Sequence, residues 1–219
     1  MGKDEQLGRV LRTGIVAILR ADDGSRMAEA AEALLAGGID VMEVTFTVPK
    51  ADRVLSDVAA RLGDRVLLGA GTILDAETAR IAILSGAEFL VSPVVAPAVI
   101  ASARRYGKLV FPGAFTPTEV LAAWEAGADI VKVFPSDCAG PAYLKALRGP
   151  LPQIRLMPTG GVNLNTAADF LRAGACALGI GGSLVDPRAL AAGDFAAIES
   201  LARQYVQVVA AARAQLAKK

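Results

Sequence analysis

The chain has 219 residues, of which 53% are hydrophobic and 21% charged, and its formal net charge is +1. This composition suits one or two compact domains, and because the sequence contains no linker we expect a single domain over residues 1–219. The balanced charge with only 5% aromatic residues argues against nucleic acid or an anionic membrane as a partner. The chain has no histidine and only two cysteines, Cys138 and Cys176, which excludes imidazole catalysis, histidine-based zinc sites and a disulfide framework.

The N-terminal residues are polar and lead into no signal-type apolar segment. No apolar run reaches the ~20 residues of a membrane span without glycine, proline or charge. We therefore expect a cytoplasmic protein.

Short apolar runs alternate with segments of helical period along the chain, such as Val54, Val58 and Leu62. The runs cover residues 15–20, 39–46, 66–72, 88–93, 109–112, 130–134, 154–159 and 176–180. Alternating strands and helices predict βα units around a parallel sheet. Eight such units predict an α/β fold, a single (β/α)8 TIM barrel, with an open doubly wound sheet as the alternative.

A repeated sequence motif supports this count of units. Four expected helices end in similar glycine-containing phrases, which centre on Gly38, Gly86, Gly127 and Gly174. Glycine just past a helix takes the left-handed conformation that ends it. At the chain ends, residues 6–13 predict a short helix that closes the barrel floor, and residues 195–219 predict a long helix that completes the eighth unit.

Three charged residues interrupt the apolar runs. Lys132 stands in the middle of residues 130–134, Glu43 lies within residues 39–46, and Arg20 ends the first run. A buried ammonium is costly and tends to lose its proton, which produces the neutral amine needed for imine chemistry. The alternatives are a lysine that reaches solvent and a purely structural ion pair between Glu43 and Lys132.

Other polar residues fall at the carboxyl ends of the runs, where a TIM barrel carries its active site. Thr47 follows the second run, Thr72 ends the third, and Ser92-Pro93 ends the fourth. Glycine-rich turns follow the last two runs, with Thr159, Gly160 and Gly161 in one and Gly181, Gly182 and Ser183 in the other. Such turns present backbone N–H groups to an anion, so we expect a phosphate here.

The chain resembles the bacterial class I aldolases that act on 2-keto-3-deoxy-6-phosphogluconate (KDPG) and 4-hydroxy-2-oxoglutarate (KHG). The resemblance spans about residues 14–190 and rests on motifs in register: Ile18-Leu19-Arg20, Glu43-Val44-Thr45-Phe46-Thr47, Gly69-Ala70-Gly71-Thr72, Ser92-Pro93, Phe111-Pro112-Gly113, Lys132-Val133-Phe134-Pro135, Pro158-Thr159-Gly160-Gly161 and Gly179-Ile180-Gly181-Gly182-Ser183.

The resemblance implies a role for each matching residue. Lys132 is the Schiff-base lysine and Glu43 the acid/base carboxylate. Arg20 and Thr72 lie around the keto-acid carboxylate, and Pro93 and Phe134 line the pocket. The phosphate loops contain Gly161, Gly181, Gly182 and Ser183. Some members have an arginine at the position of Thr47, so carboxylate binding here depends more on Arg20.

The resemblance also implies a homotrimer that binds a small keto acid and a phosphorylated aldehyde, with no metal and no organic cofactor. The 6-phosphogalactonate epimer and KHG are alternative substrates within the same chemistry. A phosphate-binding barrel that works without an imine is an alternative enzyme. A trimeric barrel used as an assembly scaffold is the non-enzymatic alternative.

Overall fold

The computed structural model describes residues 1–217, in which strands and helices alternate. The strands are β1 (Ile15–Leu19), β2 (Val41–Thr45), β3 (Leu67–Gly71), β4 (Phe89–Val91), β5 (Leu109–Phe111), β6 (Gly113–Ala114), β7 (Val131–Val133), β8 (Leu156–Pro158) and β9 (Leu178–Ile180). The helices are α1 (Lys3–Thr13), α2 (Met27–Ala36), α3 (Ala51–Leu62), η1 (Gly63–Arg65), α4 (Ala76–Leu84), α5 (Pro97–Arg105), α6 (Pro117–Glu125), α7 (Gly140–Arg148), α8 (Ala167–Arg172), α9 (Pro187–Ala192) and α10 (Phe195–Leu216).

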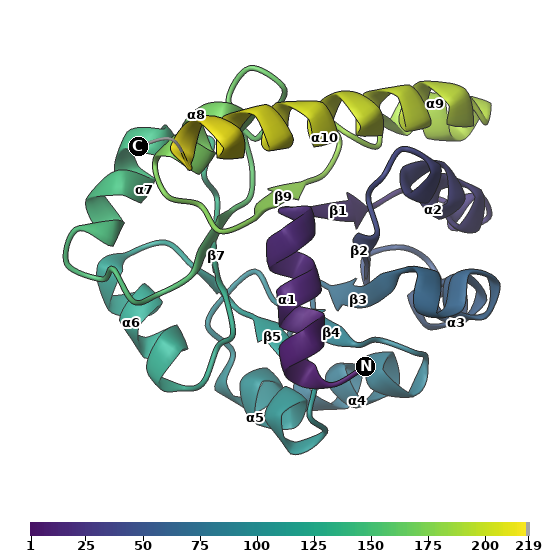
Figure 1. The fold of residues 1–219 in the computed structure, drawn as a ribbon. Coiled ribbons are helices and arrows are strands. Elements are labelled where there is room, and N and C mark those ends of the chain that lie inside the picture. The colour runs from purple at the N-terminus through teal and green to yellow at the C-terminus, as the bar shows by residue number, and fades with distance from the viewer. Residues whose placement is uncertain (218–219) are drawn as a thin grey trace.

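The strands form a curled parallel sheet with the helices around its outer side (Figure 1). Six strands pair in the order β5-β4-β3-β2-β1-β9, and three pair in the order β6-β7-β8. A single parallel bridge between Thr159 and Gly179 joins the end of β8 to β9. The predicted α/β fold is confirmed, whereas closure into one eight-stranded barrel stays a prediction.

The fifth apolar run differs from the expected single strand. Residues 109–112 were predicted as one strand, but the structure has β5 up to Phe111 and a separate β6 from Gly113. Pro112 lies between them and has no N–H to donate to a ladder, although its carbonyl accepts from the Lys132 N–H at 2.9 Å. β5 therefore pairs with β4, and β6 pairs with β7.

Apolar side chains gather in two clusters, one on each face of the sheet. The larger cluster lies between the strands and the surrounding helices and includes Leu19, Leu34 and Tyr205. The smaller cluster lies inside the curl, where the rings of Phe89 and Phe111 stack with their centroids 5.1 Å apart. Burial on both faces explains why these strands are almost wholly apolar.

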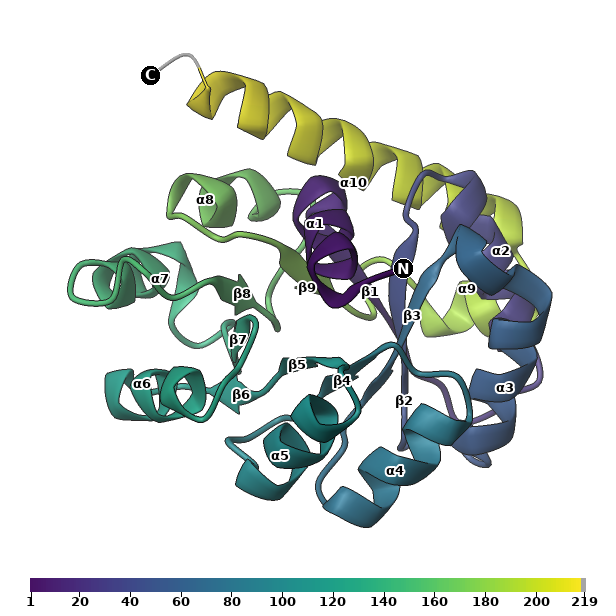
Figure 2. The same ribbon diagram turned by 60° about the horizontal axis from the view of Figure 1, so that its bottom comes forward.

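The N-terminal helix α1 covers one end of the inner cluster, as predicted. Val10 is fully buried in this cluster, and Leu7 and Leu11 pack against it. In Figures 1 and 2, α1 lies against the curled sheet beside β1. Its C-terminal carbonyls accept hydrogen bonds from Arg213 of α10, at 2.8 Å for Leu11 and 2.6 Å for Arg12. The two terminal helices are thus linked to each other.

The four repeated glycine phrases form the same helix ending, as predicted. Gly38, Gly86, Gly127 and Gly174 have φ angles of 93°, 107°, 103° and 100°, a conformation that side chains rarely adopt. After each glycine, the next residue donates its N–H to a carbonyl in the last turn of the helix, as Ile39 does to Leu34 at 2.9 Å. This Schellman geometry ends each of the four helices and leads the backbone into the following strand, β2, β4, β7 or β9.

No helix among residues 1–217 is both long enough and apolar enough to cross a bilayer.

Candidate active site

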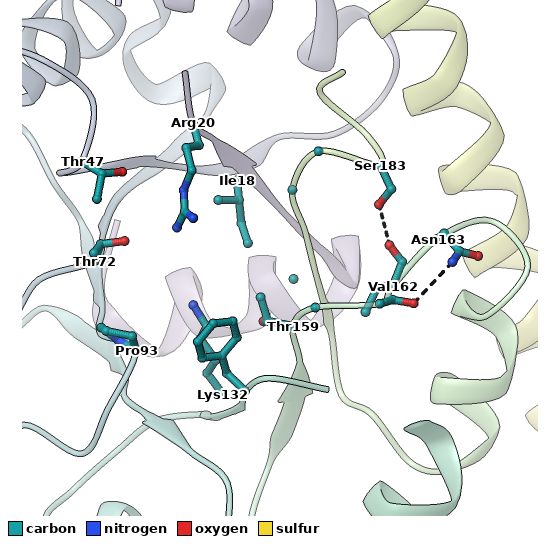
Figure 3. Close-up of a pocket in the computed structure, with 16 residues that line it drawn as sticks. Ile18, Arg20, Thr47, Thr72, Pro93, Lys132, Thr159, Val162, Asn163 and Ser183 are labelled. Atoms are coloured by element: carbon teal, nitrogen blue, oxygen red, sulfur yellow. Dashed lines mark hydrogen bonds between the residues drawn. The ribbon is translucent and has the colours of Figure 1, made fainter. Parts of the chain in front are cut away.

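A cavity of about 580 Å³ lies at the carboxyl ends of the strands (Figure 3). Its walls include every residue that the sequence analysis placed in the site except Glu43: Arg20, Thr47, Thr72, Pro93, Lys132, Phe134, Thr159, Gly160, Gly161, Gly181, Gly182 and Ser183. These residues come from seven different strand ends or the loops that follow them. The fold therefore brings together residues that are far apart in the sequence.

Lys132 lies at the bottom of this cavity, in the middle of the three-residue strand β7. It is 7% exposed, and its Nζ lies 4.9 Å from the centroid of the Phe134 ring. Burial lowers the pKa of Lys132, the negative charge of Glu43 acts in the opposite direction, and the positive charge of Arg20 adds to the lowering. The environment therefore increases the share of the neutral amine, which is the nucleophilic form.

Glu43 lies deeper, on β2, and does not line the cavity. It is 2% exposed, and burial raises its pKa, while the charges of Lys132 and Arg20 oppose that rise. Within residues 1–217, no carboxylate comes within salt-bridge distance of Lys132. The structure thus disfavours the purely structural ion pair, because no salt bridge joins Glu43 and Lys132.

One side of the cavity carries a group of donors. Arg20, Thr47 and Thr72 follow β1, β2 and β3, and their polar ends face the same side of the cavity in Figure 3. Thr45 lies behind them, fully buried, with its hydroxyl 3.3 Å from the carbonyl of Leu19 and 3.0 Å from the hydroxyl of Thr47. A guanidinium with hydroxyls beside it suits a carboxylate.

Thr72 has an unusual backbone. Its φ angle of 62° lies in the left-handed region, where a β-branched side chain is a rare outlier. The next residue, Ile73, is buried and donates its N–H to the carbonyl of Val91 at 3.0 Å. The surrounding structure therefore holds Thr72 in this conformation, and its side chain lines the cavity.

The opposite side of the cavity is made by the two glycine-rich loops (Figure 3). Gly160 and Gly161 have φ angles of 91° and 69°, and the hydroxyl of Ser183 donates to the carbonyl of Val162 at 2.5 Å, which joins the loops. Among the described residues, no backbone carbonyl accepts from the N–H groups of Gly161, Gly182 or Ser183. These donors are free for an anion.

Thr159 begins the first of these loops but lies next to the lysine strand. Its N–H donates to the carbonyl of Val133 at 3.0 Å, and it is 6% exposed. Its hydroxyl is one of three buried polar side-chain atoms within residues 1–217 that have no hydrogen-bond partner. This hydroxyl packs against Gly179 of β9, where an added Cβ atom would overlap it.

Four further residues line the cavity that sequence reasoning did not single out: Ile18, Val162, Asn163 and Gly179. Asn163 stabilises the turn before α8. Its side-chain oxygen accepts from the N–H groups of Asn165 at 2.9 Å and Thr166 at 3.2 Å. Ile18 and Val162 are apolar like their neighbours and carried no signal.

The chain matches known proteins over most of its length. The family model for KDPG and KHG aldolases matches residues 8–201. The 2-dehydro-3-deoxy-phosphogluconate aldolase of Treponema pallidum is 39% identical, over 94% of this chain and 96% of the relative. The 2-dehydro-3-deoxy-6-phosphogalactonate aldolase of Escherichia coli is 34% identical, over 78% and 83%.

Solved structures give the same result. KDPG aldolase from Legionella pneumophila, crystallised with pyruvate captured as a covalent carbinolamine intermediate, superposes with a TM-score of 0.84 at 26% identity. The superposition covers 90% of this chain and 96% of that protein. With the family model, the sequence relatives and the cavity in agreement, the chain belongs to the KDPG and KHG aldolase family.

Proposed function

We propose that this protein is a class I aldolase that cleaves KDPG to pyruvate and glyceraldehyde 3-phosphate through an imine on Lys132. The observation that carries the proposal is a lysine buried at the bottom of an open cavity, where burial lowers its pKa. Membership of an aldolase family supports the same reaction.

The reaction begins when the neutral amine of Lys132 attacks the C2 ketone of the keto acid. Loss of water from the carbinolamine gives a protonated imine, which withdraws electrons from the neighbouring bonds. The C3–C4 bond then breaks, its electron pair moves into the imine, and the C4 hydroxyl becomes the aldehyde of glyceraldehyde 3-phosphate. Protonation of the remaining enamine at C3 and hydrolysis of the imine release pyruvate and regenerate the amine.

Glu43 moves the protons in this scheme. Burial raises the pKa of Glu43, which makes its carboxyl group a better proton acceptor than an exposed glutamate. Because Glu43 lies below the cavity wall, a bound water carries the proton between its carboxylate and the substrate. Glu43 takes the proton of the C4 hydroxyl during cleavage and serves carbinolamine formation and dehydration.

The two sides of the cavity hold the two ends of the substrate. Arg20 binds the C1 carboxylate, with Thr72 and Thr47 beside it, and the loops around Gly161 and Ser183 bind the distal phosphate. Holding both ends fixes the C3–C4 bond over the imine. Thr159, which begins the first glycine-rich loop and lines the cavity, belongs to the phosphate side in this proposal.

The test is trapping with pyruvate and borohydride, followed by intact mass spectrometry and peptide mapping. We expect one reduced pyruvyl adduct, on Lys132. Lys145, on α7, is the control because it is a lysine that does not line the cavity. Folded protein without an adduct, or with an adduct on Lys145 instead, would refute imine chemistry at this site.

Substrate preference is tested separately. Both the 6-phosphogalactonate epimer and KHG fit the same steps, and one relative is named for the galactonate compound. We expect the highest kcat/KM for KDPG among the three. A higher kcat/KM for either alternative would assign the protein to that branch and keep the imine mechanism.

We further propose that the strands act as a closed ring of eight positions in which β5 and β6 together form the fifth. The pairing of β5 with β4 and of β6 with β7 supports this closure, as does the bridge from Thr159 to Gly179. A cytoplasmic location stays a prediction from the sequence.

A homotrimer is proposed as well. Large exposed apolar side chains gather on α4, α5, α6 and the loops after β3 and β4: Leu74, Ile81, Leu84, Val94, Tyr106, Leu121 and Trp124. Leu84 is 69% exposed and Leu74 58%, and burial of such side chains against another chain would support an interface here. Multi-angle light scattering should give three times the mass of one chain, and the mass of a single chain would contradict the proposal.

A further inference from the structure

Strand β3 has two glycines, and therefore no side chains, at two successive positions of one face. Gly69 and Gly71 are two residues apart, so they lie on the same face of the strand. This is the inner face of the curled sheet, because Phe89 of the inner cluster lies against Gly69. The space at Gly69 is filled by the ring of Phe89, and the space at Gly71 is filled by the carboxylate of Glu43. β3 therefore supports one group of the inner core and one group of the proposed active site.

The backbone at Gly71 does not itself require glycine. Among the residues that the structure describes, eleven glycines have a positive φ angle, and Gly71 is not one of them. A Cβ atom at this position would overlap Oε1 of Glu43 and would lie 2.7 Å from its Cδ and 3.2 Å from its Oε2. The room needed by the Glu43 carboxylate is what excludes a side chain here.

The carboxylate of Glu43 has little else to fix its place. The groups that act on it are its buried surroundings and two charges, Lys132 on β7 and Arg20 after β1, with no hydrogen bond contributing. Its position therefore depends on the shape of the space around it. Gly71 forms part of that shape, because a Cβ atom there would meet both carboxylate oxygens.

We propose that Gly71 is a positioning residue, which sets the place of the Glu43 carboxylate for proton transfer by having no side chain. The inference rests on the proposed function, because it takes Glu43 as the acid/base group. Gly71 acts through Glu43 and is not itself a catalytic residue.

The variant Gly71→Ala tests this inference. The added methyl group meets the far end of a flexible side chain, so the carboxylate can move aside while the backbone keeps its place. A displacement on the order of 1 Å lowers kcat by up to about 100-fold when it affects a reacting group. We expect kcat to fall by roughly 10- to 100-fold, the pH dependence of kcat to shift, and KM and Tm to stay close to wild type.

The matched control is Gly69→Ala on the same face of the same strand. Its methyl group would overlap the ring of Phe89, a rigid group in the core. We expect Gly69→Ala to lower Tm and to leave the pH dependence of kcat unchanged. A pH shift as large in Gly69→Ala as in Gly71→Ala would show a general packing effect and overturn the inference.

A double-mutant cycle covers the case in which Gly71→Ala also loses stability. In a Glu43→Ala background the overlapping carboxylate is gone, so adding Gly71→Ala should change neither the residual kcat nor Tm. An equal loss from Gly71→Ala in both backgrounds, or a wild-type kcat in the single variant, would overturn the inference. Failure of borohydride trapping in the wild-type protein would instead remove the proposed function, and this inference with it.

Discussion

Thr72 and Lys50 are the two residues other than glycine within residues 1–217 that have a left-handed backbone, with φ angles of 62° and 56°. Thr72 lines the cavity, whereas Lys50 is exposed at the N-terminus of α3 and lies outside it. Both conformations cost stability. Only the strained backbone at Thr72 can serve ligand binding, because only Thr72 lines the cavity. Replacing each residue with glycine separates the two effects.

The expected gain in stability is small but measurable. The left-handed conformation costs an L-residue ~1–2 kcal/mol, and glycine removes this cost. Glycine also destabilises the folded state by ~0.5–1 kcal/mol, because it has more conformational freedom to lose on folding. The net gain is then about 0.5–1 kcal/mol for either variant. For a chain of this length, each kcal/mol raises Tm by ~2–4 °C, so we expect a rise of about 1–4 °C.

Activity distinguishes the variants. Thr72→Gly removes a hydroxyl beside the keto-acid carboxylate, and a hydrogen bond to a charged group is worth ~1.5–3 kcal/mol, so KM should rise about 10- to 100-fold. Lys50→Gly should have wild-type kcat and KM. Differential scanning calorimetry and steady-state kinetics on both variants provide the test. A lower Tm in Thr72→Gly, or no loss of activity with a higher Tm, would refute the reasoning.

Three further substitutions address the charged groups and the phosphate loops. Lys132→Met should abolish turnover and raise Tm. Burial lowers the folded-state pKa of Lys132 below the ordinary 10.5, so the wild type loses stability as pH falls through the interval between these two values, and the variant does not. Tm measured against pH checks this, and a Tm advantage that grows toward high pH would contradict it. Glu43→Gln should lower kcat by roughly 10²–10⁴. Because burial raises the folded-state pKa of Glu43 above the ordinary 4.5, the same variant should also gain stability relative to wild type as pH rises through the interval between the two values. An unchanged kcat would leave Glu43 with a structural role only. Ser183→Glu places a negative charge in the glycine-rich loops and should raise KM for KDPG far more than for KHG, which has no phosphate. An equal rise in KM for both substrates would show that these loops do not bind the phosphate.

Much of the fold could be predicted from local patterns. All eight predicted apolar runs contain a strand, because both faces of these strands are buried and polar residues are excluded. The observed strands are mostly shorter than the runs; β4 lacks Glu88, Ser92 and Pro93, which lie in the turns at its ends. Helix α9 was not predicted, although Asp186 followed by Pro187 is a recognisable helix start and Asp186 does cap it.

The site was predictable where it depended on residue type and not where it depended on side-chain direction. A lysine and a glutamate within apolar strands marked β7 and β2, and glycines marked the two loops. Sequence did not indicate that Glu43 lies behind the cavity wall or that Thr72 has a left-handed backbone. These features follow from contacts between strands that are distant in the chain, which no local pattern encodes.

The pairing of the first strand with the last has a consequence during synthesis. β1 pairs with β9 through Ile15 and Leu178, so one edge of β1 has no partner until nearly the whole chain is made. A ribosome that adds ~5–20 residues per second leaves this edge open for on the order of ten seconds. During that time the open backbone groups can pair with a strand of another nascent chain. Slow translation near the 3′ end of the message would therefore favour aggregation over the native pairing.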